Sequence, residues 1–230
     1  MLAIETSQRT GSVALMSSEE PALEASFPCG SREHDSLLPS IDSLISQSHR
    51  SPGEIQVVAV SIGPGSFTGL RIATSTAKAL SLATGCRIIA VPSAWVVAEQ
   101  WYQRSADEGP VLVASAAKGK DCWLTRLERT STGLAECGPT GLHRVDALSD
   151  DVRSLCEGAM FLADDFIPES FIKSLKPLIR GVQVPAPTAL ACLLVGQQLA
   201  TTGQFVSGHA LSPLYPREPE AVALWRTRNA

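Results

Sequence analysis

Apolar residues in the first fifty positions form three short runs followed by one helical repeat. The runs Leu2–Thr6, Ser12–Met16 and Leu23–Cys29 are separated by short polar turns, which predicts three strands in an antiparallel meander. A helix is expected next, with Pro39 in its first turn, where the missing amide hydrogen costs nothing. One face of that helix carries Leu37, Leu38, Ile41, Leu44 and Ile45.

The following fifty positions predict two strands that are buried on both faces, each followed by a helix. In chain order these elements are Ile55–Ile62, a helix that ends near Thr84, Arg87–Val91 and Pro92–Gln103. The first of the two helices has Ser66 or Thr68 as its N-cap and Gly85 as its C-terminal stop. The first half therefore has the order βββαβαβα.

The second half repeats this order more faintly. It predicts a hairpin of strands at 111–116 and 122–127, followed by a helix near 145–156 and a strand at 159–163. A helix at 168–178, a strand at 181–184 and a helix at 188–201 complete it. The polar segment 104–110 is the expected linker between a lobe at 1–105 and a smaller, divergent lobe at 106–230, whose last segment could pack back on the first. Two such lobes are used by actin-like and sugar-kinase-like ATPases, so we expect an α/β fold of the actin-like (RNase H-like) type; this analogy concerns the fold alone.

Composition narrows the classes of protein that remain. Hydrophobic residues make up 44% and charged residues 18% of the chain, as in folded globular domains. The net charge of −4 argues against unaided nucleic-acid binding, which needs clustered cations. The six cysteines form no CxxC pair, so reduced thiols are expected. The start Met1–Glu5 lacks a basic leader region, and no apolar run reaches the roughly 18 residues of a membrane span, so we expect a cytoplasmic protein without membrane contact.

The strongest local motif is the glycine-rich run Gly63–Arg71 between a predicted buried strand and a helix. Glycines let a backbone turn sharply, and the free amides of a helix N-terminus can bind an anion. A P-loop is excluded because no Gly-Lys-Ser/Thr follows at the required spacing. The local chemistry favours a structural turn over a phosphate site, and the residues that build it are Gly63, Pro64, Gly65, Ser66 and Thr68.

Three polar residues, Glu5, Thr6 and Ser7, follow the first predicted strand. In actin-like ATPases a carboxylate and hydroxyls at this turn face the metal and the phosphates. A lone acid after a strand is more commonly a solvated loop residue, so we interpret these three as at most a degenerate nucleotide site. The segment 115–117, at the equivalent place in the second half, has no carboxylate to match, which argues against nucleotide hydrolysis.

Metal-dependent and covalent catalysis find no support in the motifs. The histidines His34, His49, His143 and His209 form no HxxxH or HExxH pair, and His34 is interpreted as a partly exposed residue at a helix start. Gly65-Ser66-Phe67 lacks the second glycine of a nucleophile elbow. We therefore expect no catalytic residue, no metal and no cofactor.

The helix predicted at 68–84 contains two charges, Arg71 and Lys78, and is otherwise small or apolar. A surface helix normally has a broad charged face, so this one either lies between the sheet and the other lobe or contacts a partner chain. The residues of the predicted partner interface, from this helix and the one before it, are Leu37, Ile41, Gly69, Arg71, Ala73, Thr74, Ala77 and Lys78.

At these positions the chain resembles the TsaB (YeaZ) family. The matching segments are Leu2–Ser7, Arg32–His34 with Leu37–Pro39, Gly63–Arg71 and Pro213–Arg217. The likeness covers most of 1–98 and the second half in outline. Two positions differ from the family pattern: Glu5 replaces an aspartate, and Ala116-Ala117-Lys118 replaces an Asp-Ala-Arg-like segment.

The resemblance implies a non-catalytic subunit in the synthesis of tRNA threonylcarbamoyladenosine (t6A), next to the anticodon. It implies pairing with a TsaD-like catalytic paralogue through helices of the first lobe, a TsaE-like ATPase as a further partner, and only indirect contact with tRNA. A homodimer through the same surface is also plausible. The paralogue's histidine pair is missing after Val91 here.

Two other functions stay open at this point. Glu5 and the two-lobe pattern suggest an independent actin-like ATPase or small-molecule kinase. A peptidase is the remoter alternative, because the sequence offers neither a metal pair nor a nucleophile elbow.

Overall fold

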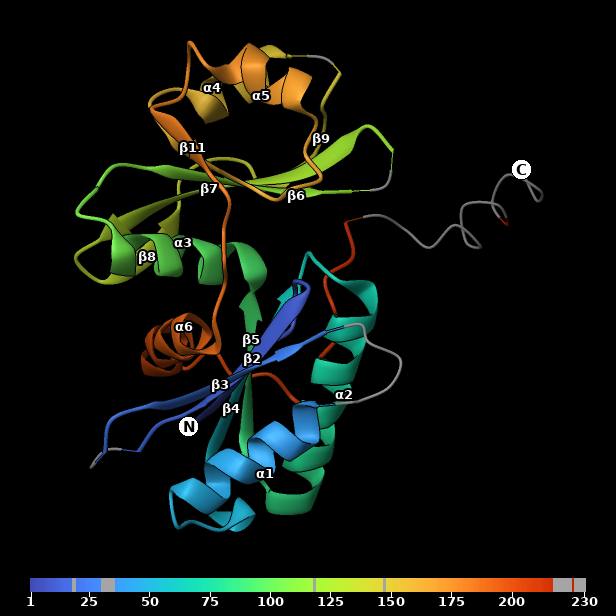
Figure 1. Cartoon of the computed structure of the whole chain (residues 1–230), viewed down its shortest axis with the longest axis vertical. Coiled ribbons are helices and arrows are strands. Elements are labelled where there is room, and N and C mark those ends of the chain that lie inside the picture. Colours follow the sequence, from blue (N-terminus) through green and yellow to red (C-terminus); the bar gives the residue numbers. More distant parts are fainter. Residues whose placement is uncertain (18–19, 30–35, 118, 147, 217–224, 226–230) are drawn as a thin grey trace.

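The computed structural model of the chain describes residues 1–17, 20–29, 36–117, 119–146, 148–216 and 225 (Figure 1). Four residues of the predicted family motifs lie outside them, namely Arg32, Glu33, His34 and Arg217. Across the described ranges, no helix has both the length and the apolar character that a bilayer crossing requires.

The first sheet contains five strands in the order β3-β2-β1-β4-β5. Their bounds are β1 Leu2–Glu5, β2 Thr10–Leu15, β3 Leu23–Pro28, β4 Val57–Gly63 and β5 Arg87–Pro92. β1, β2 and β3 form the predicted antiparallel meander, and β4 and β5 continue the sheet in parallel with β1. The helices of this half are α1 Leu37–Gln47, the short η1 Pro52–Glu54, α2 Phe67–Thr84 and α3 Ser93–Arg104.

The second sheet repeats the strand order of the first. It runs β11-β10-β6-β7-β8, with β9 paired to β7, so β6, β7, β8, β10 and β11 correspond to β1 to β5. The strands are β6 Val111–Ala116, β7 Asp121–Thr130, β8 Gly133–Glu136, β9 Gly141–Arg144, β10 Met160–Ala163 and β11 Gly181–Gln183. The helices are α4 Asp150–Cys156, α5 Glu169–Leu175 and α6 Ala189–Thr201. This duplication confirms the predicted fold class.

The sequence pattern missed two strands and misplaced one helix start. β8 and β9 have four residues each and alternate weakly, so their strand character comes from pairing with the long β7. The predicted helix near 145–156 begins only at Asp150, after the N-cap Ser149, because the Val145 amide donates to the Lys120 carbonyl instead.

The elements stack in five layers (Figure 1). α1 and α2 cover the outer face of the first sheet, α3 and α6 lie between the two sheets, and α4 and α5 cover the second sheet on its far side. α6 comes from the second half of the sequence but contacts β1, β2, β4 and β5 of the first sheet, as well as α3.

A single apolar core joins the two lobes through α3 and α6. It includes Ala59 and Ile89 of the first sheet and Val111 and Leu162 of the second, all at most 1% exposed. α6 approaches the first sheet closely at Gly196, where an added Cβ would lie 2.6 Å from the Cβ of Ala59. Any larger residue there would push the helix off the sheet.

Polar contacts fix the same layer against the second sheet. The Gln198 side chain of α6 accepts a hydrogen bond from the Leu134 amide and donates one to the Leu134 carbonyl, both at 2.9 Å. These two bonds satisfy backbone groups of β8, which lies at the edge of its sheet. Arg129 of β7 forms an ion pair at 2.9 Å with Glu99 of α3, which is 7% exposed. The lobes are therefore held by directional bonds as well as by apolar contact.

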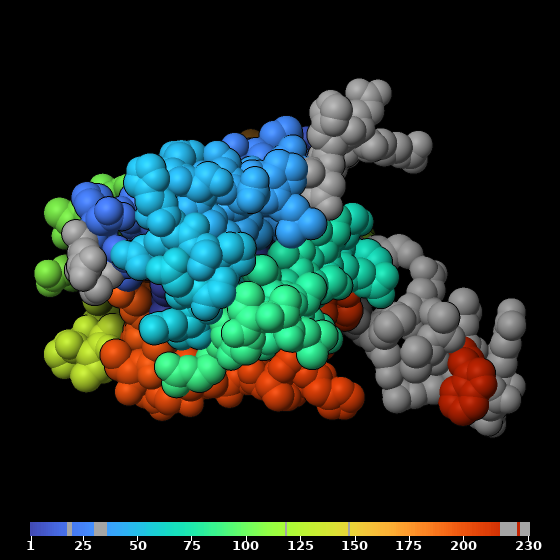
Figure 2. Space-filling model, turned by 90° about the horizontal axis from the view of Figure 1, so that it is seen from below, coloured from blue at the N-terminus to red at the C-terminus, as the bar shows by residue number. Residues whose placement is uncertain are grey.

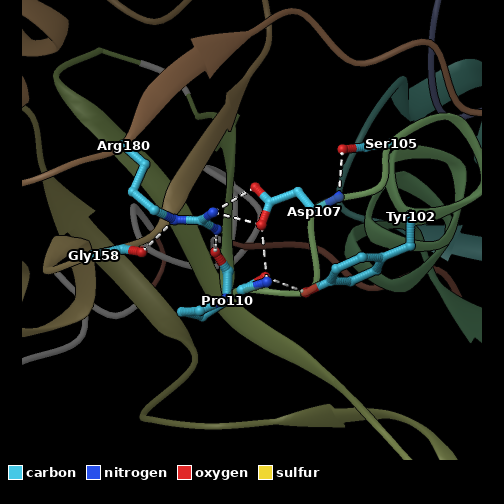
Figure 3. A network of polar contacts seen from close by, with 7 residues as sticks. Tyr102, Ser105, Asp107, Pro110, Gly158 and Arg180 are labelled. Carbon is cyan, nitrogen blue, oxygen red and sulfur yellow. Dashed lines mark hydrogen bonds and ion pairs between the residues drawn. The ribbon is translucent and has the colours of Figure 1, made fainter.

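The segment between α3 and β6, predicted as a polar linker, is held by one arginine (Figure 3). The Arg180 guanidinium binds both carboxylate oxygens of Asp107 at 2.5 Å and donates to the carbonyls of Gly158 and Pro110 at 2.7 and 2.9 Å. The Tyr102 hydroxyl donates to the Gly109 carbonyl at 2.8 Å. Hydrogen bonds from Arg180 lower the pKa of Asp107, so the carboxylate stays ionised at neutral pH. We call this set of contacts around Arg180 the brace, because it fixes the connection between α3 and β6.

Arg180→Ala should therefore loosen the brace and leave the carbonyls of Pro110 and Gly158 without their partner. We expect a loss of about 1–2 kcal/mol in the free energy of unfolding, measured by urea titration, because several charge-assisted bonds disappear at a partly exposed site. Amide hydrogen exchange should accelerate in 105–110. Arg153→Ala, at an exposed position of α4, is the matched control and should change neither quantity. Equal exchange in the linker of both variants would contradict the brace.

Candidate functional site

The glycine-rich loop between β4 and α2 is packed against the end of β1. Ser66 is the N-cap of α2, and its hydroxyl accepts a hydrogen bond from the Gly69 amide at 3.3 Å. The Ser66 amide donates to the Ser7 carbonyl at 2.7 Å. Added Cβ atoms at Gly65 and Gly69 would lie 2.4 and 2.3 Å from the carbonyl oxygens of Ser7 and Thr6. The glycines thus permit contact between two backbone segments, which leaves no space for an anion between them.

The hydroxyls after β1 face the protein interior. Thr6 and Ser7 are each 2% exposed, and the Thr6 hydroxyl donates to the Gly69 carbonyl in the first turn of α2 at 2.9 Å. Neither residue lines the cleft between the lobes. The turn that binds phosphate in actin-like ATPases is here a contact between β1 and α2.

Glu5 is buried rather than solvated, which corrects the interpretation from sequence. It lies on β1 with 0% exposure, and its Oε1 accepts a hydrogen bond from the Ser7 amide at 2.6 Å. Burial raises the pKa of this carboxyl, and the hydrogen bond from the Ser7 amide offsets only part of the effect. A carboxyl enclosed in this way is not placed to hold a metal–nucleotide complex.

The second lobe does place a carboxylate beside its first strand, although 115–117 contains none. Asp164 follows β10, and because β10 runs parallel to β6, its side chain reaches the end of that strand. Its Oδ2 accepts from the Ala116 amide at 2.7 Å and its Oδ1 from the Phe166 amide at 3.0 Å. In the sequence, the only sign of this carboxylate was an acidic residue directly after the predicted buried strand 159–163. Both oxygens are occupied by backbone amides, so this carboxylate caps the local turn.

A cleft of about 330 Å³ separates the two lobes on this side of the molecule. Its walls include Gln8, Arg9 and Thr10 of the first lobe and Asp164, Asp165 and Phe166 of the second. The Arg9 guanidinium lies 5.3 Å from the centre of the Phe166 ring and bridges the walls. Within the described ranges, no three His, Cys, Asp or Glu residues come together as a set of metal ligands.

The predicted interface on α2 has to be corrected, because most of its residues face inward. Gly69, Ala73, Thr74 and Ala77 are buried against the chain's own core, and the last three are at most 3% exposed. Leu37 and Ile41 of α1 are likewise 2% and 3% exposed. Small residues four positions apart do allow close approach, but the neighbour is the first sheet and its surroundings. Of the predicted residues, Arg71 and, in part, Lys78 reach the surface.

The outward face of α2 is nevertheless apolar and nearly uncharged. Phe67, Ile72 and Leu82 are 54%, 39% and 89% exposed, and Ser75 and Ala79 lie exposed between them at helical spacing. Figure 2 shows α2 beside α1 on one side of the molecule, and α1 adds Leu38, which is 55% exposed. We call the exposed residues of the two helices the α1–α2 face. Exposed apolar residues grouped in this way mark interaction sites.

An aromatic and cationic cluster forms one end of the α1–α2 face. The Arg71 guanidinium lies 3.9 Å from the centre of the Phe67 ring, and its Nε donates to the Tyr215 hydroxyl at 3.0 Å. The two rings are 5.2 Å apart. Sequence reasoning found Arg71 but not its link to Tyr215, because 144 positions separate the two residues.

Two sheets of the same strand order around a shared helical layer define a two-lobed actin-like (RNase H-like) α/β protein. The family model for "TsaD: tRNA N6-adenosine threonylcarbamoyltransferase" matches residues 29–144, half of the chain. The chain belongs to the TsaB (YeaZ) family, within this TsaD-related group of proteins.

Two relatives named TsaB match the chain over different lengths. The "tRNA threonylcarbamoyladenosine biosynthesis protein TsaB" of Escherichia coli (strain K12) is 27% identical over 94% of both chains. The protein of that name from Buchnera aphidicola subsp. Acyrthosiphon pisum is 32% identical over 58% of this chain and 60% of its own length. The structure "YeaZ from Pseudomonas aeruginosa" has a TM-score of 0.78 at 21% identity, covering 93% of this chain and 98% of that one, and supports the fold.

Glu5→Gln should remove a pH dependence of stability. The native pKa lies above the ordinary value of 4.5, so the contribution of Glu5 to stability is complete below about pH 4.5. It declines as the pH rises toward the native pKa, by at most about 1.4 kcal/mol per pH unit. The stability of Glu5→Gln relative to wild type should therefore increase from pH 4.5 to 8 in urea titrations. The exposed Glu20→Gln is the control, and a difference that is constant with pH would refute the assignment.

Proposed function

We propose that the chain is a non-catalytic subunit of t6A biosynthesis in the cytoplasm, needed for threonylcarbamoyl transfer to the tRNA adenosine next to the anticodon. In this proposal it pairs with a TsaD-like catalytic subunit, and a TsaE-like ATPase joins the pair. The name of the Escherichia coli relative, which matches along 94% of both chains, supports the pathway. The net charge of −4 supports indirect contact with tRNA through the partner subunits.

The observation that carries the partner role is the α1–α2 face. Leu82 at 89% exposure and Leu38 at 55% are large apolar side chains on helices whose sequences contain only three charged residues. An isolated protein gains nothing from leaving such side chains in water, whereas a helix-to-helix contact would bury them. A second copy of the chain is the alternative occupant of this face.

The closed turn after β1 supports a role without nucleotide chemistry. The Thr6 hydroxyl, the Ser7 carbonyl and the amide of Ser66 bind one another or α2, and Glu5 is enclosed. An independent ATPase or kinase would need these groups to face the cleft between the lobes. The fixed connection through Arg180 also opposes the lobe closure that such enzymes use.

Leu82→Asp tests the partner role. A charge at this position is tolerated by the free chain, because the side chain is exposed, but would be buried and unpaired in the complex. We expect the dissociation constant for the TsaD-type protein of the same genome to rise by roughly 100-fold or more, measured by calorimetry. The t6A content of tRNA, measured by mass spectrometry in a strain that depends on the variant, should fall in parallel.

The control is Val184→Asp, which changes another exposed apolar residue, 62% exposed at the cleft between the lobes. It should leave both quantities unchanged. If Val184→Asp abolished pairing and Leu82→Asp did not, the partner would bind at the cleft and the α1–α2 face would have another role.

A further inference from the structure

We infer that the α1–α2 face recognises an acidic partner helix through Arg71, and that Tyr215 and Phe67 hold the Arg71 guanidinium ready for a carboxylate of that partner. The inference rests on the proposed function and adds the chemistry of the partner surface. It also distinguishes the TsaD-type protein from a second copy of this chain as the occupant.

The Arg71 side chain is fixed on two sides. The Phe67 ring lies under the guanidinium at 3.9 Å, and the Tyr215 hydroxyl occupies Nε at 3.0 Å. The Tyr215 ring is also near the cation, at 5.9 Å from its centre. A guanidinium held in this way has lost part of its rotational freedom before binding, so less entropy is lost when a partner arrives.

Within the residues that the structure describes, the two terminal nitrogens of Arg71 have no hydrogen-bond or ion-pair partner. Over the described part of the chain, no acid lies within ion-pair distance of Arg71, and its single side-chain hydrogen bond is the one to Tyr215. The pair of N–H groups on Nη1 and Nη2 matches the two oxygens of a carboxylate. In an apolar surrounding such a bidentate bond gives direction as well as attraction.

Tyr215 is a positioning residue that the C-terminal segment carries to this place. The Leu214 amide donates to the Ile62 carbonyl at 2.6 Å, and Leu211 is 2% exposed in the core beneath α1 and α2. Gly63 admits this segment, because an added Cβ would lie 2.8 Å from the Leu214 carbonyl oxygen. The backbone immediately before Tyr215 is therefore fixed by the first lobe.

The charges of the two helices disfavour a second copy. Their sequences contain the cations Arg71 and Lys78 but a single acid, Asp42. Two copies packed through this face would bring four cations and two acids into one apolar contact, with a net repulsion. A partner helix with carboxylates and an apolar stripe would neutralise the cations, so charge complementarity favours a different protein.

The test compares Arg71→Gln, Arg71→Lys and Tyr215→Phe for binding to the TsaD-type protein of the same genome, at low and high sodium chloride. Arg71→Gln should raise the dissociation constant about 10- to 100-fold at low salt and flatten its salt dependence. Arg71→Lys should keep the salt dependence but bind more weakly than wild type, since an ammonium group cannot bond in the bidentate form. Arg153→Gln on α4 is the matched control and should behave as wild type.

Tyr215→Phe tests positioning apart from general stability. It should weaken binding about threefold to tenfold in the wild-type background, because the Nε bond is lost. In the Arg71→Gln background it should add nothing, since there is no guanidinium left to position. An equal effect in both backgrounds would mean that Tyr215 supports the fold alone, and would remove it from the inference.

Three results would overturn the inference. If Arg71→Gln leaves affinity and salt dependence unchanged while Leu82→Asp abolishes pairing, the partner binds the α1–α2 face but offers no carboxylate to Arg71. If the chain alone forms a tight dimer in sedimentation at low salt, and Asp42→Asn dissolves it, the carboxylate belongs to a second copy. Failure of Leu82→Asp itself would remove the proposed pairing face and this inference with it.

Discussion

Helices α3 and α6 are buried around most of their circumference because they lie between the two sheets. Leu193 and Val195 of α6, and Val96 and Ala98 of α3, are at most 1% exposed in the core that also contains residues of both sheets. Each sheet needs a cover on its inner face, and here one helical layer covers both. Separating the lobes would expose that layer to water, so the two halves of the chain form one cooperative structure.

This shared layer explains which parts of the fold the sequence could predict. Strands β4 and β5 and the caps of α2 depend on neighbours in sequence, and Ser66 and Gly85 mark that helix as expected. Apart from β8, the duplicated order of strands followed from the same local patterns. The side on which α6 lies did not, because Gln197 and Gln198 are too few to give this largely apolar helix a broad polar face that orients it. β8 and β9 were missed because their strand character comes from β7, a partner that no local pattern reveals.

The predicted interface on α2 shows a second limit of prediction from sequence. The spacing of Gly69, Ala73 and Ala77 predicts a close contact, and a close contact exists, but it is with the chain's own core. A stripe of small residues cannot say whether its neighbour is a sheet or another protein. The more informative feature was the scarcity of charge on α2, since a helix with one buried face should be charged on the other. The exposed Ile72, Ala79 and Leu82 are what that scarcity left at the surface.

The closed turn after β1 and the α1–α2 face are parts of one packed unit. The Thr6 hydroxyl donates to the Gly69 carbonyl, and the Ser7 carbonyl accepts from the Ser66 amide. Nearby, the Leu214 amide donates to the Ile62 carbonyl. Phe67 and Arg71 lie at the start of α2, which these bonds fix in place. In an actin-like ATPase the same turn must stay open for phosphate, and the first turn of this helix would then be free to respond to it. Filling the turn with the chain's own backbone removes that freedom and makes the start of α2 rigid. A rigid helix start suits a binding surface, because the aromatic and cationic groups on it need no reordering when a partner arrives.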